Sequence, residues 1–439
     1  MVSGGTYGTE QIISGAGYGH GILILLFLPV LWCLPTAFMI GELTSALPAE
    51  GGYYAWVRRG LGNFWGFQEA WLSLAASIFD MAIYPTLFVF YLKQFSPWFG
   101  TPRHAIAAGL FVVVGCAALN LSGIRVVGIT SLWLFFCLSA PFALVVILSP
   151  LKAGALASAA PAAATTQGAG LGLLGGVLVA MWNYMGWDNA STIAQEVERP
   201  QRTYPRAMIA AVVLVALTYI APFVAVYFTG SPASKFAEDG SWATIAGLIG
   251  GTILGFEWLR FLIVVGGMMS AFGMFNALVM SYSRLPLAMA QDGMLPKIFA
   301  KTSKRTDAPW VAILVCATCW GLCLGLGFKR LVTIDIMLYG ASLSLEFVTL
   351  VALRIREPGL KRDFRVPGGM VGAILTGWFP ISLLCLAMVE SQRETILGMN
   401  GLVFGAIIMV AGFVAYVATR RLRRPALTPV MQEGMESTA

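Results

Sequence analysis

Residues 183–191 read "NYMGWDNAS" and lie inside a stretch, 172–195, that is otherwise apolar enough to cross a bilayer. Gly186 weakens a helix, and a charged Asp188 in the hydrocarbon would cost roughly 2.5–3.5 kcal/mol. Irregular backbone at this depth is tolerated only where it is buried in protein or lines a cavity. The stretch therefore predicts a discontinuous membrane helix whose free backbone groups and carboxylate face a ligand.

The rest of the chain has the composition of a polytopic helical membrane protein. Of its 439 residues, 58% are hydrophobic and only 11% are charged, and the mean hydropathy is +0.78. Apolar runs long enough to span a membrane recur along the whole length, which predicts an all-α protein with about 11–12 transmembrane helices. The expected spans are 1–15, 20–47, 63–95, 104–121, 124–149, 172–195, 205–229, 255–290, 309–328, 331–353, 370–390 and 396–419.

The basic residues are unevenly distributed between alternate loops. Most of the 28 lysines and arginines fall in one set of loops, around 58–59, 199–206, 297–305, 354–365 and 420–424. The positive-inside rule places this set, and the C-terminal tail, in the cytoplasm. We expect the membrane to be the plasma (cytoplasmic or inner) membrane. The net charge of +7 is explained by this asymmetry, so we expect no nucleic-acid partner.

Several carboxylates fall within or near apolar spans, where each needs a partner or a watery cavity. We expect Glu42 to pair with a loop arginine. Glu69 follows the basic loop with Arg58 and Arg59 and is also expected to form a structural ion pair. For Glu346, deep in its span, a structural and a functional role are equally consistent with the sequence.

A second glycine-rich break, "SGGTYG" at 3–8, opens the chain, with Glu10 shortly after it. Two broken segments, one opening each half, are what an inverted repeat produces, with spans one to five and six to ten as the two halves.

Four motifs resemble the amino acid–polyamine–organocation (APC) superfamily of transporters over nearly the full length. They are "SGGTYGTE" (3–10), "GELTSALPAEGGYYAWVRRGLGNFWGFQEAW" (41–71), "WNYMGWDNASTIAQEVERPQRTYPRAM" (182–208) and "SRLPLAMAQDGMLPKIFAKTSKRTDAPW" (283–310). The last two are highly specific together. Within the superfamily, "GGTYGTE", "WGFQEAW", "FDMAIYP" and "GWDNAST" look most like the polyamine-uptake (polyamine:proton symporter) branch.

The resemblance implies a LeuT-type fold, with a 5+5 inverted repeat and two extra C-terminal helices. It implies one transmembrane domain over 1–420, with repeats at 1–150 and 172–356, extra helices at 370–420, and a cytoplasmic tail at 421–439. Because Met1 aligns with the middle of a helix, the first helix is truncated here, and we expect the natural protein to begin upstream or this chain to be a shortened form.

The resemblance also implies a substrate site between broken helices one and six, flanked by helices three and eight. Ser3, Gly4 and Gly5 would form the first break, and Gly186 and Asp188 the second. The expected substrate-binding residues are Ser3, Gly4, Gly5, Glu10, Asp80, Tyr84, Trp182, Tyr184, Gly186 and Asp188, with Trp182 as an aromatic lid. Some proton-coupled members carry a lysine in helix five, but span 124–149 has none, so the coupling ion stays open between H+ and Na+.

We expect a secondary active transporter of a polyamine or another small organic cation, since Glu10, Asp80 and Asp188 supply anionic partners. An amino-acid permease or exchanger is the alternative, because glycine N–H groups at a helix break bind carboxylates. A channel, a receptor or an intramembrane hydrolase fits less well: the chain shows neither a filter-like repeat, nor a P-loop, nor a metal constellation. We therefore expect no enzyme activity, no cofactor, no metal and no obligate protein partner. The expected partners are the lipid bilayer and a small organic cation or amino acid.

The charge asymmetry makes a testable prediction of topology. A cysteine introduced as Ser303→Cys lies in the basic loop 297–305 and should be labelled by a membrane-impermeant thiol reagent only after the cells are permeabilised. Labelling of this position in intact cells would contradict the predicted orientation.

Overall fold

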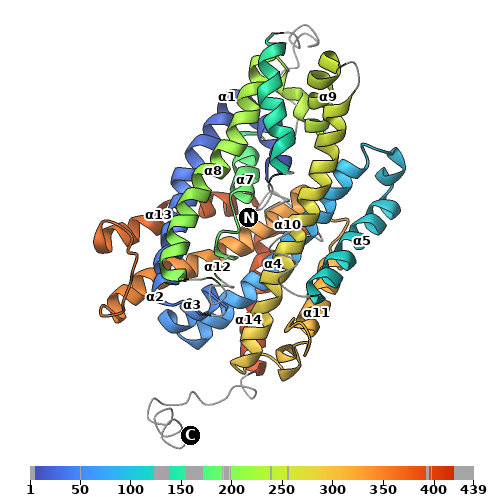
Figure 1. The fold of residues 1–439 in the computed structure, drawn as a ribbon. Helices are drawn as coiled ribbons and strands as arrows, with labels where there is room; N and C mark the ends of the chain where they lie inside the picture. Colours follow the sequence, from blue (N-terminus) through green and yellow to red (C-terminus); the bar gives the residue numbers. More distant parts are fainter. Residues whose placement is uncertain are drawn as a thin grey trace, which may run out of the picture.

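The structure, a computed structural model, describes the chain except for residues 1–4, 50, 123–135, 137, 155–171, 190, 192–196, 198, 238–239, 255–256, 392–394, 397 and 420–439. The expected break residues Ser3 and Gly4 and the tail 421–439 lie outside the described residues. The described part of the chain is almost entirely helical (Figure 1).

The helical elements form one bundle of long, tilted helices. The first part comprises η1 (Thr6–Gly8), α1 (Glu10–Leu28), η2 (Pro29–Cys33), α2 (Leu34–Ala46), α3 (Tyr53–Leu61), α4 (Asn63–Leu92), η3 (Pro97–Gly100), α5 (Pro102–Leu121), the apolar helix Leu138–Lys152, whose last turn is η4 (Ser149–Lys152), and α7 (Gly172–Asn183). The second part comprises α8 (Pro200–Phe228), η7 (Ala233–Ala237), α9 (Ser241–Leu254), α10 (Trp258–Gln291), η8 (Lys297–Ala300), α11 (Trp310–Leu322), α12 (Phe328–Arg356), α13 (Gly369–Ser391) and α14 (Gly401–Ala418). A short antiparallel pair, β1 (Thr395–Ile396) and β2 (Met399–Asn400), precedes α14.

The prediction of a polytopic membrane protein is confirmed. In the described part of the chain, 8 helical segments are long and apolar enough to cross a membrane, and three further apolar helices are shorter. One of the eight, Glu10–Ala46, contains two expected spans. Gly17 separates them with a non-helical backbone (φ 73, ψ 171), a conformation that glycine adopts without steric cost.

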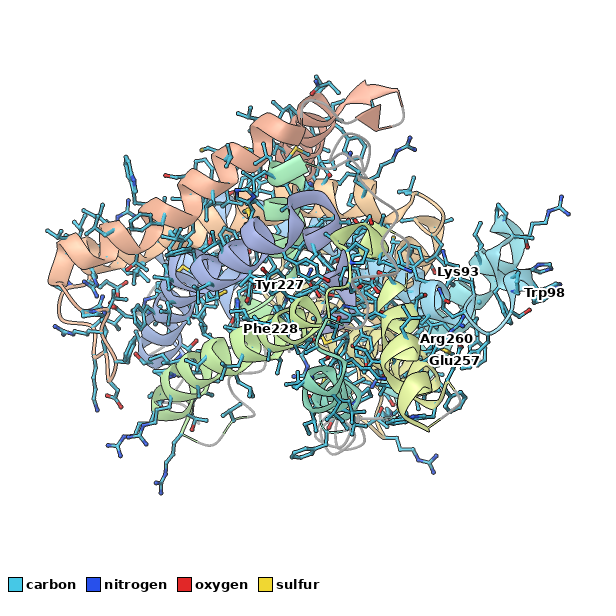
Figure 2. The ribbon with its side chains drawn as sticks, turned by 90° about the horizontal axis from the view of Figure 1, so that it is seen from above. Lys93, Trp98, Tyr227, Phe228, Glu257 and Arg260 are labelled. Atoms are coloured by element: carbon cyan, nitrogen blue, oxygen red, sulfur yellow. The ribbon has the colours of Figure 1, made fainter. Side chains whose placement is uncertain are left out.

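Two helices were not expected from the sequence, and they mark opposite ends of the bundle (Figure 1). α3 is a short amphipathic helix that packs against α4 and α12 at one end, here called the α3 side. α9 packs against α10 at the other end, the α9 side. Figure 2 looks onto that end, where Arg260 lies beside Glu257 and hydrogen bonds to Gln94.

The core of the bundle is the antiparallel packing of α4 against α12, with α10 against the other flank of α4. Both α4 and α12 are largely buried along their lengths, unlike α8 and α14, which expose most of their apolar side chains. Helices that are surrounded by protein and do not contact lipid can carry polar side chains, provided that those side chains have hydrogen-bond or ionic partners. α4 and α12 hold most of the buried carboxyl groups described below.

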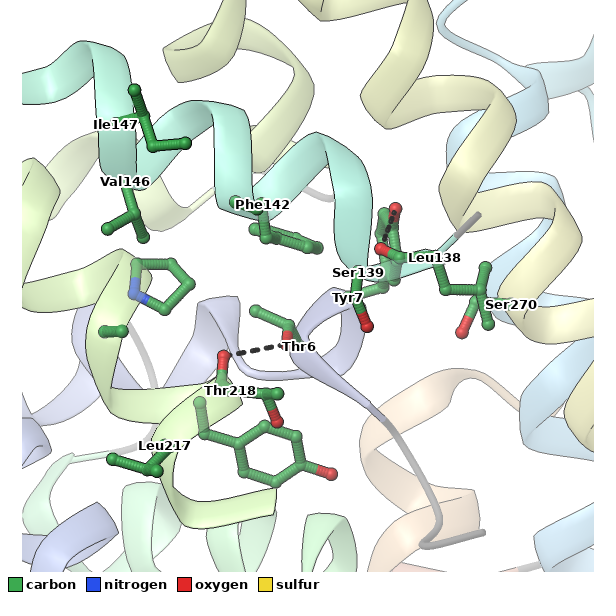
Figure 3. A pocket seen from close by; sticks show the side chains of 14 residues that line it. Thr6, Tyr7, Leu138, Ser139, Phe142, Val146, Ile147, Leu217, Thr218 and Ser270 are labelled. Atoms are coloured by element: carbon green, nitrogen blue, oxygen red, sulfur yellow. Dashed lines mark hydrogen bonds between the residues drawn. The ribbon is translucent and has the colours of Figure 1, made fainter. Parts of the chain in front are cut away.

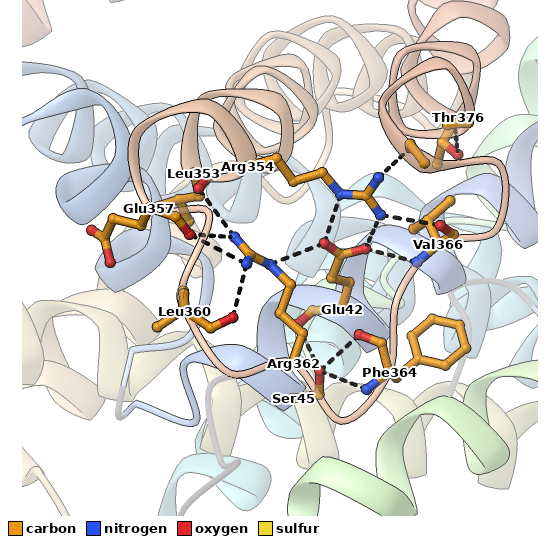
Figure 4. Close-up of polar contacts among 12 residues, drawn as sticks. Glu42, Ser45, Leu353, Arg354, Glu357, Leu360, Arg362, Phe364, Val366 and Thr376 are labelled. Carbon is orange, nitrogen blue, oxygen red and sulfur yellow. Dashed lines mark hydrogen bonds and ion pairs between the residues drawn. The ribbon is translucent and has the colours of Figure 1, made fainter.

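Glu42 of α2 is the centre of a buried ionic cluster (Figure 4). The Nε of Arg354 donates to Glu42 at 2.8 Å, the Nε of Arg362 lies 3.2 Å from the same carboxylate, and the backbone N–H of Val366 donates at 2.7 Å. Glu42 is 0% exposed and the two guanidinium groups are nearly so. The expected pairing of Glu42 with a loop arginine is confirmed, and it joins α2, the end of α12 and the loop before α13.

The expected ion pair of Glu69 is wrong. Arg58 pairs with Asp292, and Arg59 pairs with Glu357 at 2.9 Å. Both arginines lie on α3 and reach groups near the surface, whereas Glu69 is buried on α4. Sequence proximity to a basic loop therefore did not specify its partner.

Removing the carboxylate of the buried cluster should destabilise the fold. Glu42→Ala leaves Arg354 and Arg362 without their anion, and we expect it to cost about 3–5 kcal/mol, seen as a large drop in the thermal unfolding midpoint in detergent. Glu357→Ala removes the half-exposed partner of Arg59 and should cost less than about 1 kcal/mol. Equal losses from the two variants would contradict the assignment of Glu42 as a structural centre.

Candidate functional site

The predicted break after α7 is present. The helix ends at Asn183, and Gly186 has φ 89, in the left-handed region that disfavours other residues. Side chains satisfy the carbonyl groups freed by the break: Tyr219 Oη donates to Asn183 O at 3.0 Å, and Trp187 Nε1 donates to Tyr184 O at 2.7 Å. The irregular backbone is therefore held by hydrogen bonds within the protein, as non-helical backbone at membrane depth requires.

Asp80 of α4 lies at the centre of a ring of neutral donors. Tyr84 Oη and Trp182 Nε1 donate to its Oδ1, each at 3.2 Å. Tyr282 Oη of α10 donates to its Oδ2 at 3.2 Å. Asp80 is 4% exposed, so these bonds replace water around a carboxyl group that three separate helices hold in place.

Asp188, at the break, is held by a different helix. Tyr339 Oη of α12 donates to its Oδ1 at 2.6 Å, and Asp188 is 3% exposed. The adjoining Asn189 connects the two carboxylates, because its Nδ2 donates at 3.3 Å to the same Tyr282 hydroxyl that donates to Asp80. The Tyr282 hydroxyl and the Asn189 amide thus connect Asp80 to the residue next to Asp188.

A third carboxyl group, Asp335 of α12, joins this pair. It is 2% exposed, interacts electrostatically with both Asp80 and Asp188, and its Oδ2 has no hydrogen-bond partner among the described residues. We call these three residues the acidic centre. Within the described part of the chain, none of the three forms an ion pair with a basic side chain. Buried carboxyl groups without a basic partner can bind a positively charged ligand, which would compensate for their burial.

Aromatic rings border the acidic centre. The ring centroids of Tyr84 and Trp182 are 6.2 Å apart, and Trp182 meets Phe328 edge-on at 5.4 Å. η1 approaches the same indole so closely that a Cβ added to Gly8 would lie 3.0 Å from the Trp182 ring. Aromatic faces stabilise ammonium groups by cation–π attraction, so this border adds to the preference for a cation.

The other predicted site residues are placed differently. Asn183 Nδ2 donates to Gly8 O at 2.9 Å and so joins the two expected breaks, and Gly5 has φ 61 at the start of η1. Glu10 accepts hydrogen bonds from Tyr91 Oη and Trp242 N; Tyr91 lies about three turns, or roughly 16 Å, beyond Asp80 on α4. The hydroxyl of Tyr184 donates to Leu25 O at 3.0 Å. Glu10 and Tyr184 are therefore not part of the acidic centre.

A separate apolar cavity of about 400 Å³ adjoins η1 (Figure 3). It lies between the apolar helix Leu138–Lys152 and α8, and the Thr6 hydroxyl donates to Thr218 O at its edge. Ile147 and Leu217 on its rim are 66% and 60% exposed. An apolar crevice that opens between exposed aliphatic side chains is suited to lipid chains and not to a charged solute.

Asp335, Tyr282 and Tyr339 were missed by the sequence reasoning. A signal for two of them was present: "DMAIY" at 80–84 and "DIMLY" at 335–339 both place a tyrosine one helical turn after an aspartate. The sequence does not reveal that the tyrosine of one motif bonds to its own aspartate while the other bonds to Asp188.

An all-helical membrane bundle with a broken helix beside buried carboxyl groups is the architecture of a membrane transporter. A sequence model described as amino acid permease matches residues 1–419. A polyamine transporter of Arabidopsis thaliana is 33% identical over 412 residues, covering 93% of this chain and 81% of the relative. A polyamine transporter of Oryza sativa subsp. japonica is 33% identical over 441 residues, covering 98% and 79%.

The chain belongs to the amino acid permease family. An uncharacterized transporter of Mycobacterium tuberculosis is also similar, at 29% identity over 300 residues, 68% of this chain and 64% of the relative. The resemblance to the APC superfamily is confirmed, and the protein is a multi-pass membrane transporter rather than an enzyme.

The positive φ of Gly186 makes a prediction about the break. Gly186→Ala forces a Cβ onto a backbone conformation that costs about 1–3 kcal/mol, so Asp188 should shift and ligand binding or transport should fall while expression is largely retained. Gly359→Ala is the matched control, since Gly359 lacks a positive φ and has open space around it. Wild-type transport by Gly186→Ala would show that the break does not position the site.

Proposed function

We propose that the protein is a secondary active transporter of a polyamine or a similar organic cation. The observation that carries this proposal is the acidic centre, three buried carboxyl groups from α4, the break and α12 that have no basic partner among the described residues. Asp80 and Asp188 accept hydrogen bonds from neutral tyrosine and tryptophan donors, and Oδ2 of Asp335 has no partner in the described part of the chain. The names of the Arabidopsis and rice relatives support the same substrate class.

A linear polyamine suits this arrangement for two reasons. It carries no carboxylate, so it needs anions and aromatic faces rather than helix N-termini. It also presents several ammonium groups along a chain, and the acidic centre offers carboxyl groups on different elements. Asp80 would bind one ammonium group next to Trp182, and Asp188 would bind another at the break.

The transport cycle is expected to follow the LeuT-type scheme. We propose inverted repeats at 1–150 and 172–356, extra helices at 370–420, and breaks at Ser3–Gly5 and Gly186–Asp188. The α3 side, which carries the basic loops, would face the cytoplasm of a plasma or inner membrane, together with the C-terminal tail. Uptake would be coupled to H+ or Na+.

An amino-acid permease or exchanger is the second candidate. It is favoured by the description of the family and by the glycines at both breaks, whose N–H groups bind carboxylates. Binding of amines and amino acids to the same purified protein distinguishes the two, because an amino-acid site requires the substrate carboxylate and a polyamine site does not.

Charge removal at the acidic centre should weaken amine binding. Asp188→Asn keeps the shape of the side chain and should cost on the order of 2–4 kcal/mol, about 30- to 1000-fold in putrescine affinity, if it faces an ammonium. Asp80→Asn should cost less affinity than Asp188→Asn if Asp80 reaches only the second amine of the substrate, and the longer polyamines should lose more affinity than putrescine.

The control for these variants is Asp307→Asn, which makes the same chemical change in an exposed loop where φ is 53 and asparagine is well tolerated. Binding is measured by calorimetry on purified protein, across pH. Unchanged affinity and an unchanged pH profile in Asp188→Asn would remove Asp188 from the site and the main reason for a cationic substrate.

A further inference from the structure

A second pair of carboxyl groups lies on the same two helices, on the α3 side of the acidic centre. Glu69 precedes Asp80 on α4, and Glu346 follows Asp335 on α12, by the same number of residues in opposite directions. That separation is about three turns, or roughly 16 Å, and it returns both side chains to the helix faces that carry Asp80 and Asp335. Because α4 and α12 pack antiparallel, Glu69 and Glu346 lie at the same height in the bundle as each other, just as Asp80 and Asp335 do.

This pair is buried and only partly satisfied. Glu69 and Glu346 are each 0% exposed. Ser73 Oγ donates to Glu69 Oε1 at 2.8 Å, whereas Glu69 Oε2 and both oxygens of Glu346 have no hydrogen-bond partner among the described residues. The two glutamates interact electrostatically with each other and with Asp188. Two buried carboxylates cannot persist without a compensating cation.

A third group independently points to the same place. Tyr53 of α3 is 0% exposed, interacts electrostatically with Glu69, Glu346 and Asp188, and its hydroxyl is also without a partner in the described part of the chain. Buried hydroxyl groups are normally bonded. Among the described residues, the titratable neighbours that interact with the pair are Tyr53 from α3, Asp188 from the break and Tyr339 from α12, and each is anionic or neutral.

We propose that Glu69, Glu346 and Tyr53 form a proton-binding site that couples proton movement to transport. All three side chains are 0% exposed, and a proton is the compensating cation that needs neither a coordination shell nor a hydrated cavity. A proton bonded to an oxygen of Glu346 meets this condition and converts one carboxylate into a donor toward the other.

The site has a direct use in the transport cycle, and this use rests on the proposed function. When the α3 side opens, water reaches the pair, the O–H bond of the protonated glutamate breaks, and the proton passes to water. The carboxylate left behind is a negative charge about three turns from the acidic centre. It attracts the substrate ammonium toward the α3 side, so proton release and substrate movement occur in the same direction.

The transport test compares Glu346→Gln and Glu69→Gln with wild type in proteoliposomes. Accumulation of radiolabelled putrescine driven by a pH gradient should fall on the order of tenfold, the scale of a typical coupling free energy. Putrescine affinity should change by less than about threefold, because neither glutamate belongs to the acidic centre and each glutamine variant leaves Asp80 and Asp188 in place. The control is Glu257→Gln, which makes the same change in an exposed side chain at the N-terminal end of α10. This variant should behave as wild type. Wild-type pH-driven accumulation by both glutamine variants, or dependence on a sodium gradient instead, would overturn the proposal.

A second measurement does not require any substrate. Infrared difference spectra of the purified protein across pH report protonated carboxyl groups directly. Glu346→Gln should remove a carboxylic acid band at neutral pH, and Tyr53→Phe, which retains both glutamates, should shift that band without removing it. Acid bands unchanged in Glu346→Gln would refute the site even if amine transport is intact. If wild type binds no amine, the proposed function fails, while these spectra still decide the protonation of the pair.

Discussion

The antiparallel packing of α4 against α12 is the contact on which the rest of the site depends. Each helix alone carries carboxyl groups that a lipid-facing helix could not tolerate. Packed together, they enclose those groups between two protein surfaces and place them at matching levels. The tyrosines one turn after Asp80 and Asp335 then satisfy two different aspartates, so the hydrogen bonds of the acidic centre also fix the register of α4, α12 and the break.

The architecture and part of the site could be predicted from local features. Helix number follows from the length of apolar runs, and the break follows from Gly186 beside Asp188 inside such a run. Asp80, Tyr84 and Trp182 were expected near the substrate, and the structure brings these three into direct contact. These features depend on short stretches of sequence or on matches to specific motifs.

The remaining site residues depend on contacts between distant segments. Asp335 and Tyr339 become site residues only because α12 packs against α4 in one register, and Tyr282 only because α10 reaches Asp80. The same limit explains the incorrect partner of Glu69: the nearby arginines are on a separate helix, α3, whose geometry directs them to Asp292 and Glu357. Glu10 was expected to be one of three anionic partners of the substrate, with Asp80 and Asp188, but α1 places it at the level of Tyr91.

The ionic cluster at Glu42 restricts which parts of the bundle can move apart. Its carboxylate is shared by Arg354 at the end of α12 and Arg362 in the next loop, while Glu42 itself belongs to α2. Separating these elements would leave two buried guanidinium groups without an anion. We therefore expect α2 and the adjoining end of α12 to move together in the proposed transport cycle, with any opening of the α3 side at the contacts between these elements and their neighbours. On this expectation, a carboxylate outside the acidic centre would determine which helices separate during transport.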